Sequence, residues 1–185
     1  GSVCYALERL GVQPQVVADA TGLQNADRVI LPGVGAAPEA MRRLHAQGLV
    51  EPLRALAVPL LGICLGMQLL YERSEEGDVA CLGLLPGTVR RLQPAPGIRI
   101  PHMGWNFVNL KQKNALVENL DAESKFYFVH SYYVECTNTE NVLATTSYGN
   151  DFHSIIHDEN IFGAQFHPEK SHKFGMQILS NFSKI

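Results

Sequence analysis

Leu61-Gly62-Ile63-Cys64-Leu65-Gly66-Met67-Gln68 places a thiol between two glycines at a point where the character of the chain changes. An apolar run from Val58 to Ile63 ends there, and a helical pattern from Leu65 to Glu72 follows it. The spacing glycine-x-nucleophile-x-glycine is typical of a tight strand-to-helix turn whose flanking positions have no room for side chains. The sequence therefore predicts that Cys64 is a nucleophile at the end of a buried strand. A buried structural cysteine is the alternative.

Such a turn would also favour the chemistry of the thiol. The sulfur projects into open space, and the backbone amides after the turn point toward the group that the sulfur attacks. The positive end of the following helix favours both a thiolate and a developing oxyanion. We therefore expect the backbone around Cys64 to activate it.

Short apolar runs alternate with helical patterns in the first third of the chain. Gln15 to Ala18, Arg28 to Leu31 and Val58 to Ile63 read as buried strands, and Pro38 to Gln47 as an amphipathic helix. This alternation predicts an α/β fold with a doubly wound, mostly parallel sheet flanked by helices, in which catalytic groups collect at the carboxyl ends of strands. Later segments predict an additional, more antiparallel strand layer or extension of the sheet, and a last helix: Val89 to Leu92, Gly104 to Leu110, Lys125 to Glu135, Val142 to Ser147, Ile161 to Phe166, and helical Phe174 to Phe182.

The chain opens with a helical pattern from Val3 to Leu10 that ends at Gly11. An α/β domain usually begins with a strand, so we expect that an amino-terminal strand is missing from this sequence. The length of 185 residues is compatible with one domain, spanning residues 1–185.

Composition argues against several classes of protein. The chain is 46% hydrophobic and 18% charged, its formal net charge is −3, and its basic residues are scattered, so no nucleic-acid partner is expected. No apolar segment approaches the length needed to cross a bilayer, and the first residues have no signal-peptide organisation. We therefore expect no membrane partner and a cytoplasmic location.

The cysteines and histidines give no metal-binding spacing. Cys4, Cys81 and Cys136 are far apart in the sequence and are expected to be small core residues. His153 and His157 are four residues apart, but they lie in a segment that reads as two strands around a turn at residues 158–160. No metal site is predicted.

A base for the thiol is predicted near the carboxyl end of the chain, in Gly163-Ala164-Gln165-Phe166-His167-Pro168-Glu169. An apolar strand leads directly into His167, Pro168 ends the pairing, and Glu169 can turn back to hold the imidazole. A cysteine nucleophile needs a base, and the base needs an orienting group. Cys64, His167 and Glu169 are therefore the predicted catalytic triad.

A third segment, Leu31-Pro32-Gly33-Val34-Gly35, follows the second predicted strand. Its glycines allow the backbone to approach a ligand and to turn its amides inward, so this loop is a candidate oxyanion donor. A plain turn between strand and helix is the alternative.

Together these motifs resemble the class I glutamine amidotransferases, which hydrolyse glutamine and pass ammonia to a partner synthase. The resemblance rests on Gly-Ile-Cys-Leu-Gly-Met-Gln, Pro-Gly-Val-Gly and Phe-His-Pro-Glu, and it covers nearly the whole chain in the same order. Three further segments are similar to the glutaminase subunits of imidazole glycerol phosphate synthases, from histidine biosynthesis: Pro101 to Asn106, Phe126 to Tyr133, and Lys170-Ser171.

The resemblance implies a role for each matching residue. Cys64 would be the nucleophile, His167 the base and acid, and Glu169 its orienting group, with no cofactor or metal. Gly33, Val34, Gly35 and the amide of Leu65 would stabilise the oxyanion. L-glutamine would be held by Gln68 and the backbone around Ser131 and Tyr132, while Trp105, Tyr132 and Lys170 would face a (β/α)₈-barrel cyclase in a heterodimer.

A glutaminase that worked continuously would waste glutamine, so we expect hydrolysis to depend on the partner. The loop from Pro32 to Gly35 is the expected switching element, because a glycine-flanked peptide can rotate its amide toward or away from the oxyanion. Several alternatives remain at this point. The chain could serve another synthase, such as one that forms anthranilate, guanylate or carbamoyl phosphate. It could also be a cysteine peptidase or deglycase of a related fold, or a catalytically decayed scaffold subunit.

Overall fold

Three parallel strands carry the segment around Cys64 in the computed structural model, which describes all 185 residues. β2 (Leu60–Ile63) lies between β1 (Val29–Leu31) and β12 (Ile161–Ala164) and pairs in parallel with both. The register aligns Ile63 with Ala164. The residues that follow β2 and β12 therefore leave the sheet at the same edge, although about a hundred residues separate them in the sequence.

The sheet continues from β12 mainly through antiparallel pairs. The order of its main path is β1-β2-β12-β11-β9-β5-β3-β4, with β10 beside β11 and β7 beside β10. A separate two-stranded sheet is formed by β6 and β8. The bounds are β3 (Arg73–Ser74), β4 (Val79–Ala80), β5 (Gly87–Arg91), β6 (His102–Phe107), β7 (Asn109–Leu110), β8 (Lys125–His130), β9 (Tyr132–Cys136), β10 (Val142–Tyr148) and β11 (Asn150–Asp158).

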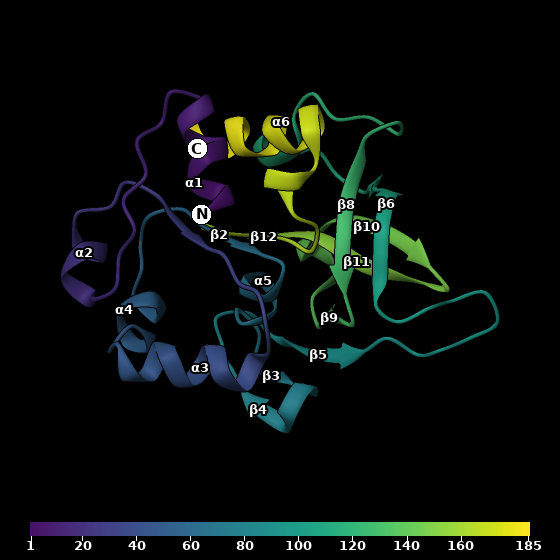
Figure 1. Ribbon diagram of the computed structural model, residues 1–185, viewed down its shortest axis with the longest axis horizontal. Coiled ribbons are helices and arrows are strands. Elements are labelled where there is room, and N and C mark those ends of the chain that lie inside the picture. The colour runs from purple at the N-terminus through teal and green to yellow at the C-terminus, as the bar shows by residue number, and fades with distance from the viewer.

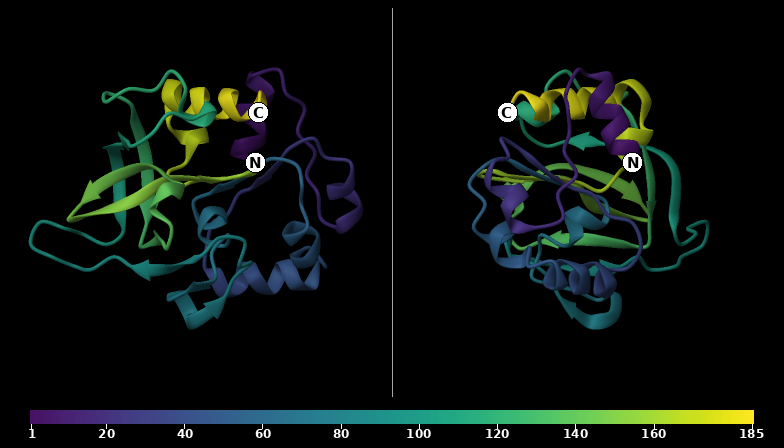
Figure 2. Two further views of the ribbon diagram at one scale, coloured as in Figure 1. Left: turned by 180° about the vertical axis from the view of Figure 1, so that it is seen from behind. Right: turned by 60° about the vertical axis from the view of Figure 1, so that its left-hand side comes forward.

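Helices cover both faces of the parallel strands. α1 (Ser2–Arg9) and α6 (His172–Ser183) lie together on one face, and α3 (Ala37–Ala46) and α4 (Val50–Arg54) lie on the other (Figure 1; Figure 2). The remaining helical segments are α2 (Ala20–Gln24), α5 (Leu65–Gln68), and the 3₁₀ turns η1 (Glu76–Asp78), η2 (Ala115–Val117), η3 (Thr139–Asn141) and η4 (Pro168–Lys170). None of these helices has the length and apolar character required to span a membrane.

β2 is buried on both faces because it lies between the two helical layers. Leu60 packs into a core cluster with residues of α3 and α4, whereas Leu61 and Ile63 pack into a second cluster with residues of α1 and α6. Alternating side chains of a strand point to opposite faces, so a strand covered on both faces needs a continuous apolar run. This requirement explains the uninterrupted apolar sequence before Cys64.

The predicted α/β class is confirmed, and the sheet is mixed. Its three neighbouring parallel strands lie beside Cys64, as expected, and one further parallel pair joins β3 to β5. Most of the antiparallel strands extend the same sheet rather than forming a layer of their own; only β6 and β8 are separate from it. The expected helices at both ends of the chain, the helix after β1 and the hairpin of β11 and β12 are all present.

Two sequence expectations are wrong. Residues 15–18 form no strand: Val16 is 85% exposed, and β1 already ends the sheet with no further strand beside it, so this segment has no backbone partner. The helix expected from Leu65 to Glu72 ends at Gln68. The carbonyl groups of Leu69, Leu70 and Tyr71 accept hydrogen bonds from the backbone of residues 82–85 instead of continuing the helix.

The apolar run from Lys125 to Glu135 is divided at Ser131. β8 belongs to the two-stranded sheet, and β9 belongs to the large sheet. Ser131 is therefore the point at which the chain passes from one sheet to the other. Backbone groups at such a crossing are not all used by sheet pairing, so they are free to contact a ligand.

Gly66 tests how tightly α5 is packed against β1. A Cβ atom at residue 66 would overlap the backbone carbonyl of Leu31, which cannot move without breaking the parallel sheet. We expect Gly66→Ala to lower the free energy of unfolding by more than about 3 kcal/mol, because overpacking against backbone is costly. Urea unfolding followed by circular dichroism measures this.

Gly97→Ala is the control. Gly97 has a positive φ, which Gly66 does not, but open space surrounds the position of its Cβ atom, so a cost of about 1 kcal/mol is expected. Equal effects of the two substitutions would contradict the close packing of α5 on β1.

Candidate functional site

Cys64 occupies a strained turn between β2 and α5. Its φ of 55° and ψ of −113° are unusual for a residue with a side chain and cost about 1 to 3 kcal/mol. Gly62 and Gly66 make the turn possible: a Cβ atom on Gly62 would lie 2.7 Å from the carbonyl oxygen of Gly66. The predicted strand-to-helix turn is therefore present, and both glycines are required by contacts with backbone.

His167 follows β12 at the same edge of the sheet. The backbone N–H of His167 donates to the carbonyl oxygen of Tyr127 (3.0 Å), and its own carbonyl accepts from the hydroxyl of Ser171 (2.6 Å). Nδ1 of the imidazole lies 3.4 Å from Oε2 of Glu169, and both side chains are buried. The ring is thus fixed at its backbone and at Nδ1, which leaves Nε2 free to face the cavity.

The charge on His167 is stabilised by its neighbours. Burial lowers its pKa, but the interactions with Cys64 and Glu169 outweigh that effect and raise the pKa to about 9. The second carboxylate oxygen of Glu169, Oε1, is buried and accepts no hydrogen bond. A carboxylate in this setting favours a protonated imidazole, because the pair would otherwise leave a buried negative charge without compensation.

Two amide side chains extend from the thiol into the core. Nε2 of Gln165 lies 3.7 Å from Sγ of Cys64, and Nε2 of Gln68 donates to Oε1 of Gln165 (3.1 Å) and to the carbonyl oxygen of Tyr132 (2.9 Å). Sγ also lies 3.8 Å from the carbonyl oxygen of Val129. The sulfur is therefore held between β12 and the end of β8.

A cavity of about 350 Å³ opens at the thiol. Cys64 and His167 line it, together with all seven residues expected to stabilise the oxyanion or bind substrate: Gly33, Val34, Gly35, Leu65, Gln68, Ser131 and Tyr132. Glu169 lies behind the imidazole. The structure thus brings the expected catalytic and substrate-binding residues to one place.

The loop after β1 forms one wall of this cavity. Gly35 has a φ of +95°, and Val34 is 83% exposed, so the side chain of this loop points to solvent and its backbone is available to the cavity. Gly33 lies close to α5, where a Cβ atom would be 2.9 Å from Cβ of Leu65. Glycine at both positions lets the loop approach the turn that carries the thiol.

Glu76 is the only carboxylate that lines the cavity, and sequence reasoning missed it. Its Oε1 accepts from the backbone N–H of Ala37 at the start of α3 (2.7 Å), and Oε2 has no hydrogen bond within the chain. Its own N–H donates to the hydroxyl of Ser74 (3.1 Å). The four carboxylates between Glu72 and Asp78 look alike in sequence, and only the fold reveals which of them reaches the cavity.

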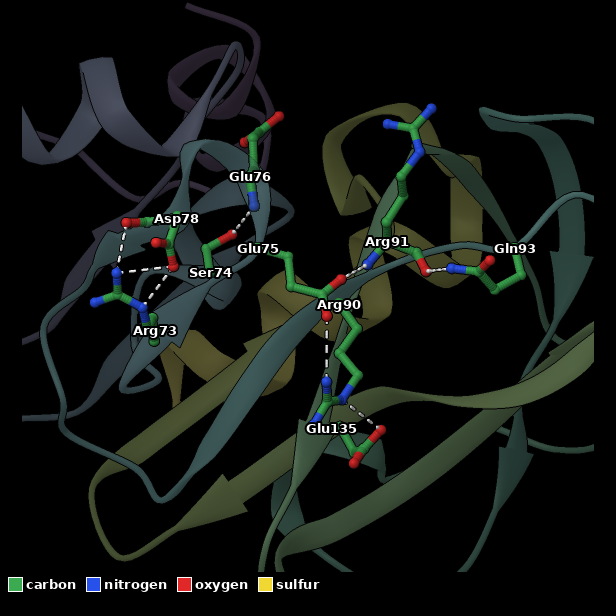
Figure 3. Close-up of polar contacts among 9 residues, drawn as sticks. All are labelled: Arg73, Ser74, Glu75, Glu76, Asp78, Arg90, Arg91, Gln93 and Glu135. Atoms are coloured by element: carbon green, nitrogen blue, oxygen red, sulfur yellow. Dashed lines mark hydrogen bonds and ion pairs between the residues drawn. The ribbon is translucent and has the colours of Figure 1, made fainter.

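A surface network holds the segment that carries Glu76 (Figure 3). Glu75 accepts hydrogen bonds from the backbone of Arg91 (2.8 Å) and from the side chain of Arg90 (3.2 Å), while Arg73 pairs with Asp78. Each exposed ion pair stabilises the fold little. The contacts of Glu75 attach residues 73–78 to β5, and the pair of Arg73 with Asp78 closes the segment on itself, so both limit where Glu76 can lie.

The three residues expected to face the partner do not form one cluster. Trp105 lies on β6, outside the cavity, with its ring stacked on His172 (5.1 Å) and edge-on to Tyr127 (5.9 Å). Lys170 is exposed in η4. Tyr132 lies in the large sheet, lines the cavity and contacts Arg91, so Tyr127 rather than Tyr132 accompanies Trp105.

The other cysteines and the histidine pair considered as metal ligands lie in ordinary structural surroundings. Cys81 and Cys136 are buried as expected, whereas Cys4 is only half-buried. His153 accepts a hydrogen bond at Nδ1 from the backbone of Cys136 (3.1 Å), and Nδ1 of His157 lies 3.1 Å from the side-chain amide of Asn114. No three His, Cys, Asp or Glu side chains are grouped as metal ligands.

Known proteins are similar to this chain over its whole length. Over all 185 residues the chain is 60% identical to "Imidazole glycerol phosphate synthase subunit HisH" of Xanthomonas axonopodis pv. citri (strain 306) and 58% identical to the protein of the same name from Xylella fastidiosa (strain Temecula1), covering 92% of each. The crystal structure of a glutamine amidotransferase from Thermotoga maritima is similar in fold, with a TM-score of 0.67 and 17% identity, covering 100% of this chain and 76% of that one.

The family model that matches is "Glutamine amidotransferase class-I", and the match extends over residues 1–185. The resemblance inferred from the sequence motifs is therefore confirmed. The chain belongs to the class I glutamine amidotransferase family.

Proposed function

We propose that this chain is the glutaminase subunit of an imidazole glycerol phosphate synthase. It would hydrolyse L-glutamine to glutamate and deliver the ammonia to a cyclase partner in histidine biosynthesis. The observation that carries the proposal is the meeting of Cys64 and His167 at one cavity, from two parallel strands that the register places side by side. The 58–60% identity to proteins named as HisH supports this synthase over those that form anthranilate, guanylate or carbamoyl phosphate.

The first half-reaction needs a strong nucleophile, because an amide is a poor electrophile. The thiolate of Cys64 attacks the side-chain carbonyl carbon of glutamine and forms a C–S bond. The resulting oxyanion is stabilised by backbone N–H groups of Leu65 and of the loop at residues 33–35. The C–N bond then breaks, and the imidazolium of His167 gives its proton to the departing ammonia.

The second half-reaction releases glutamate. His167, now neutral, takes a proton from water as the water attacks the γ-glutamyl thioester, and the C–S bond breaks to return the thiolate of Cys64. Glu169 keeps the ring in one orientation and in one tautomer through both steps. Atoms and charge balance without a cofactor.

The cavity also suggests how the amino-acid end of glutamine is recognised. Glu76 provides a negative charge at the cavity wall for the α-ammonium group, while Gln68 and the backbone of Ser131 and Tyr132 provide polar contacts. A glutamine whose α-nitrogen is in a peptide bond lacks this ammonium group. The placement of Glu76 therefore favours free glutamine over the peptide substrates of a cysteine peptidase.

The outer face of β6 is the proposed contact with the (β/α)₈-barrel cyclase. Met103, Trp105 and Phe107 alternate along this strand and are 63%, 46% and 46% exposed. Large exposed apolar side chains on one strand face are typical of protein interfaces. A flip of the glycine-flanked loop at residues 33–35 is the proposed response to binding, because such a peptide can direct its N–H toward or away from the oxyanion.

Replacing the nucleophile tests the proposal most simply. We expect Cys64→Ser to lower glutaminase activity by about three powers of ten or more, because serine lacks the acidity and nucleophilicity of the thiol. The wild-type protein should be alkylated stoichiometrically at Cys64 by the chloroketone analogue of L-glutamine, as measured by intact mass. Cys4→Ser is the control and should behave as wild type. An inert wild-type protein would instead favour the decayed scaffold.

Glu169→Gln tests the role of the carboxylate. The amide removes one of the interactions that raise the pKa of His167 to about 9, so the imidazolium loses its proton at a lower pH. We expect the alkaline limb of the pH profile of kcat/KM to move to lower pH, with a loss of activity of about tenfold at neutral pH. His167→Ala should lose more activity. An unchanged alkaline limb in Glu169→Gln would argue against this assignment.

Glu76→Gln tests recognition of the α-ammonium group. Loss of a charged partner should raise KM for glutamine about ten- to hundredfold, with a smaller change in kcat. Glu123→Gln, at an exposed turn, is the matched control. Steady-state kinetics would contradict this role if both variants kept the wild-type KM.

Partner dependence is tested by adding the purified cyclase together with its nucleotide ligand. We expect the glutaminase rate to rise on addition, and Trp105→Ala to weaken that response by about tenfold through loss of an aromatic anchor. Activation by a different synthase, and not by the cyclase, would redirect the proposal to that synthase.

A further inference from the structure

A buried chain of hydrogen bonds runs from β6 to the cavity wall. Nδ1 of His130 lies 2.8 Å from the carbonyl oxygen of Tyr132, Nε2 of His130 lies 2.9 Å from Nδ1 of His102, and Nε2 of His102 lies 3.2 Å from Nδ2 of Asn106. None of these groups belongs to the proposed catalytic triad. This series of hydrogen bonds connects β6, which carries the exposed apolar side chains, with Tyr132, the residue next to Ser131.

The partners fix every proton in this chain. A carbonyl oxygen only accepts, so Nδ1 of His130 carries the proton and its Nε2 accepts from Nδ1 of His102. Nε2 of His102 must then accept from the amide of Asn106. That amide is itself oriented, because Nδ2 also donates to the carbonyl of Ser147 (3.0 Å) and Oδ1 accepts from the backbone of Phe107 (2.7 Å).

Both rings are held neutral by their surroundings. His102 is 3% exposed and His130 is 6% exposed. Burial lowers the pKa of His102 to about 4 and, with the nearby His102 and His167, that of His130 to about 3, against the opposing hydrogen bond to Tyr132. His102 is also stacked between Phe128 (4.9 Å) and Tyr148 (3.9 Å). A single pattern of donors and acceptors therefore persists at neutral pH.

The last acceptor in this series of hydrogen bonds, the carbonyl oxygen of Tyr132, belongs to a residue that lines the cavity. The carbonyl oxygen of Tyr132 accepts from His130 and also from Nε2 of Gln68 (2.9 Å), so both of its lone pairs are used. His130 itself lines the cavity, at the end of β8 where the chain passes between sheets. The position of this one carbonyl thus sets both the backbone at residues 131–132 and the side chain of Gln68.

We propose that His130, held in one tautomer by His102 and Asn106, is a positioning residue that sets the backbone of Ser131 and Tyr132 for binding glutamine. This inference rests on the proposed function and deepens it. Asn106 and His102 alternate with Met103 and Trp105 along β6, so the strand that presents the exposed apolar face is joined through its inner face to the substrate site by hydrogen bonds. Displacement of β6 by a partner would move the carbonyl of Tyr132.

Two substitutions of His130 separate its two nitrogens. The amide nitrogen of asparagine can take the place of Nδ1 and donate to Tyr132, whereas the amide of glutamine reaches the place of Nε2 and leaves the carbonyl of Tyr132 without this donor. Positioning through Tyr132 predicts that His130→Gln slows labelling of Cys64 by the chloroketone analogue of L-glutamine about tenfold, and that His130→Asn retains most of the rate. Urea unfolding establishes that both variants are folded.

Iodoacetamide provides a second readout. It reacts with the thiol but has no α-ammonium or α-carboxylate group, so it does not depend on the part of the cavity that binds these groups of glutamine. Peptide mass spectrometry should find the alkylation rate of Cys64 within about twofold of wild type in His130→Gln, since the thiol itself is unchanged. Equal losses in His130→Gln and His130→Asn, with both reagents, would overturn the inference in favour of a purely structural histidine. Wild-type labelling of His130→Gln by the chloroketone would also overturn it.

Asn106→Asp tests the far end without altering the core rings. A carboxylate cannot donate a hydrogen bond to His102. The donors and acceptors along this series of hydrogen bonds must then exchange roles, or one group must take up a proton, and chloroketone labelling should slow about tenfold. Asn109→Asp, on exposed β7, carries the same change of charge and should label at the wild-type rate. Equal rates for the two variants would overturn the inference. If the wild-type protein itself resists the chloroketone while iodoacetamide alkylates Cys64, the proposed function fails instead.

Discussion

The parallel pairing of β2 with β12 is the constraint on which the site depends. It aligns Ile63 with Ala164, so the two strands end together and release Cys64 and His167 at one edge of the sheet. All other parts of the site are arranged around that edge: the loop after β1, the turn at η1 and the crossing at Ser131. A shift of one residue in this register would turn the strand residues to the opposite faces and separate the two groups.

The same site concentrates features that cost stability. Cys64 has a positive φ, Glu169 has a buried oxygen without a partner, and two histidines are buried as neutral rings. Apolar packing on both faces of β2 offsets these costs, and the glycines at residues 62 and 66 keep the turn free of overlap. The destabilising features therefore lie in the same few residues as the function. A group that must react with a substrate often lacks a hydrogen-bond partner, or has a strained conformation, when no substrate is bound.

The sequence predicted the parts of this site that have a local pattern. Cys64 was found from its glycines and from a change of periodicity, and His167 from a strand that ends at proline. Gln165, Glu76 and His130 were missed because their roles depend on contacts between distant segments, such as the hydrogen bond that Gln68 donates to Gln165, 97 residues away. The order in which the strands pair was not predicted for the same reason: a strand run does not indicate which neighbour it will join, as the division at Ser131 illustrates.

The coupling between Cys64 and His167 is the central claim, and a titration of the His167 imidazole by NMR tests it most directly. We expect a pKa near 9 for His167 in the wild-type protein and a clear decrease in Cys64→Ser, where the thiol that interacts with the imidazole is gone. A His167 that titrates near its ordinary value of 6.5 in both proteins would contradict it.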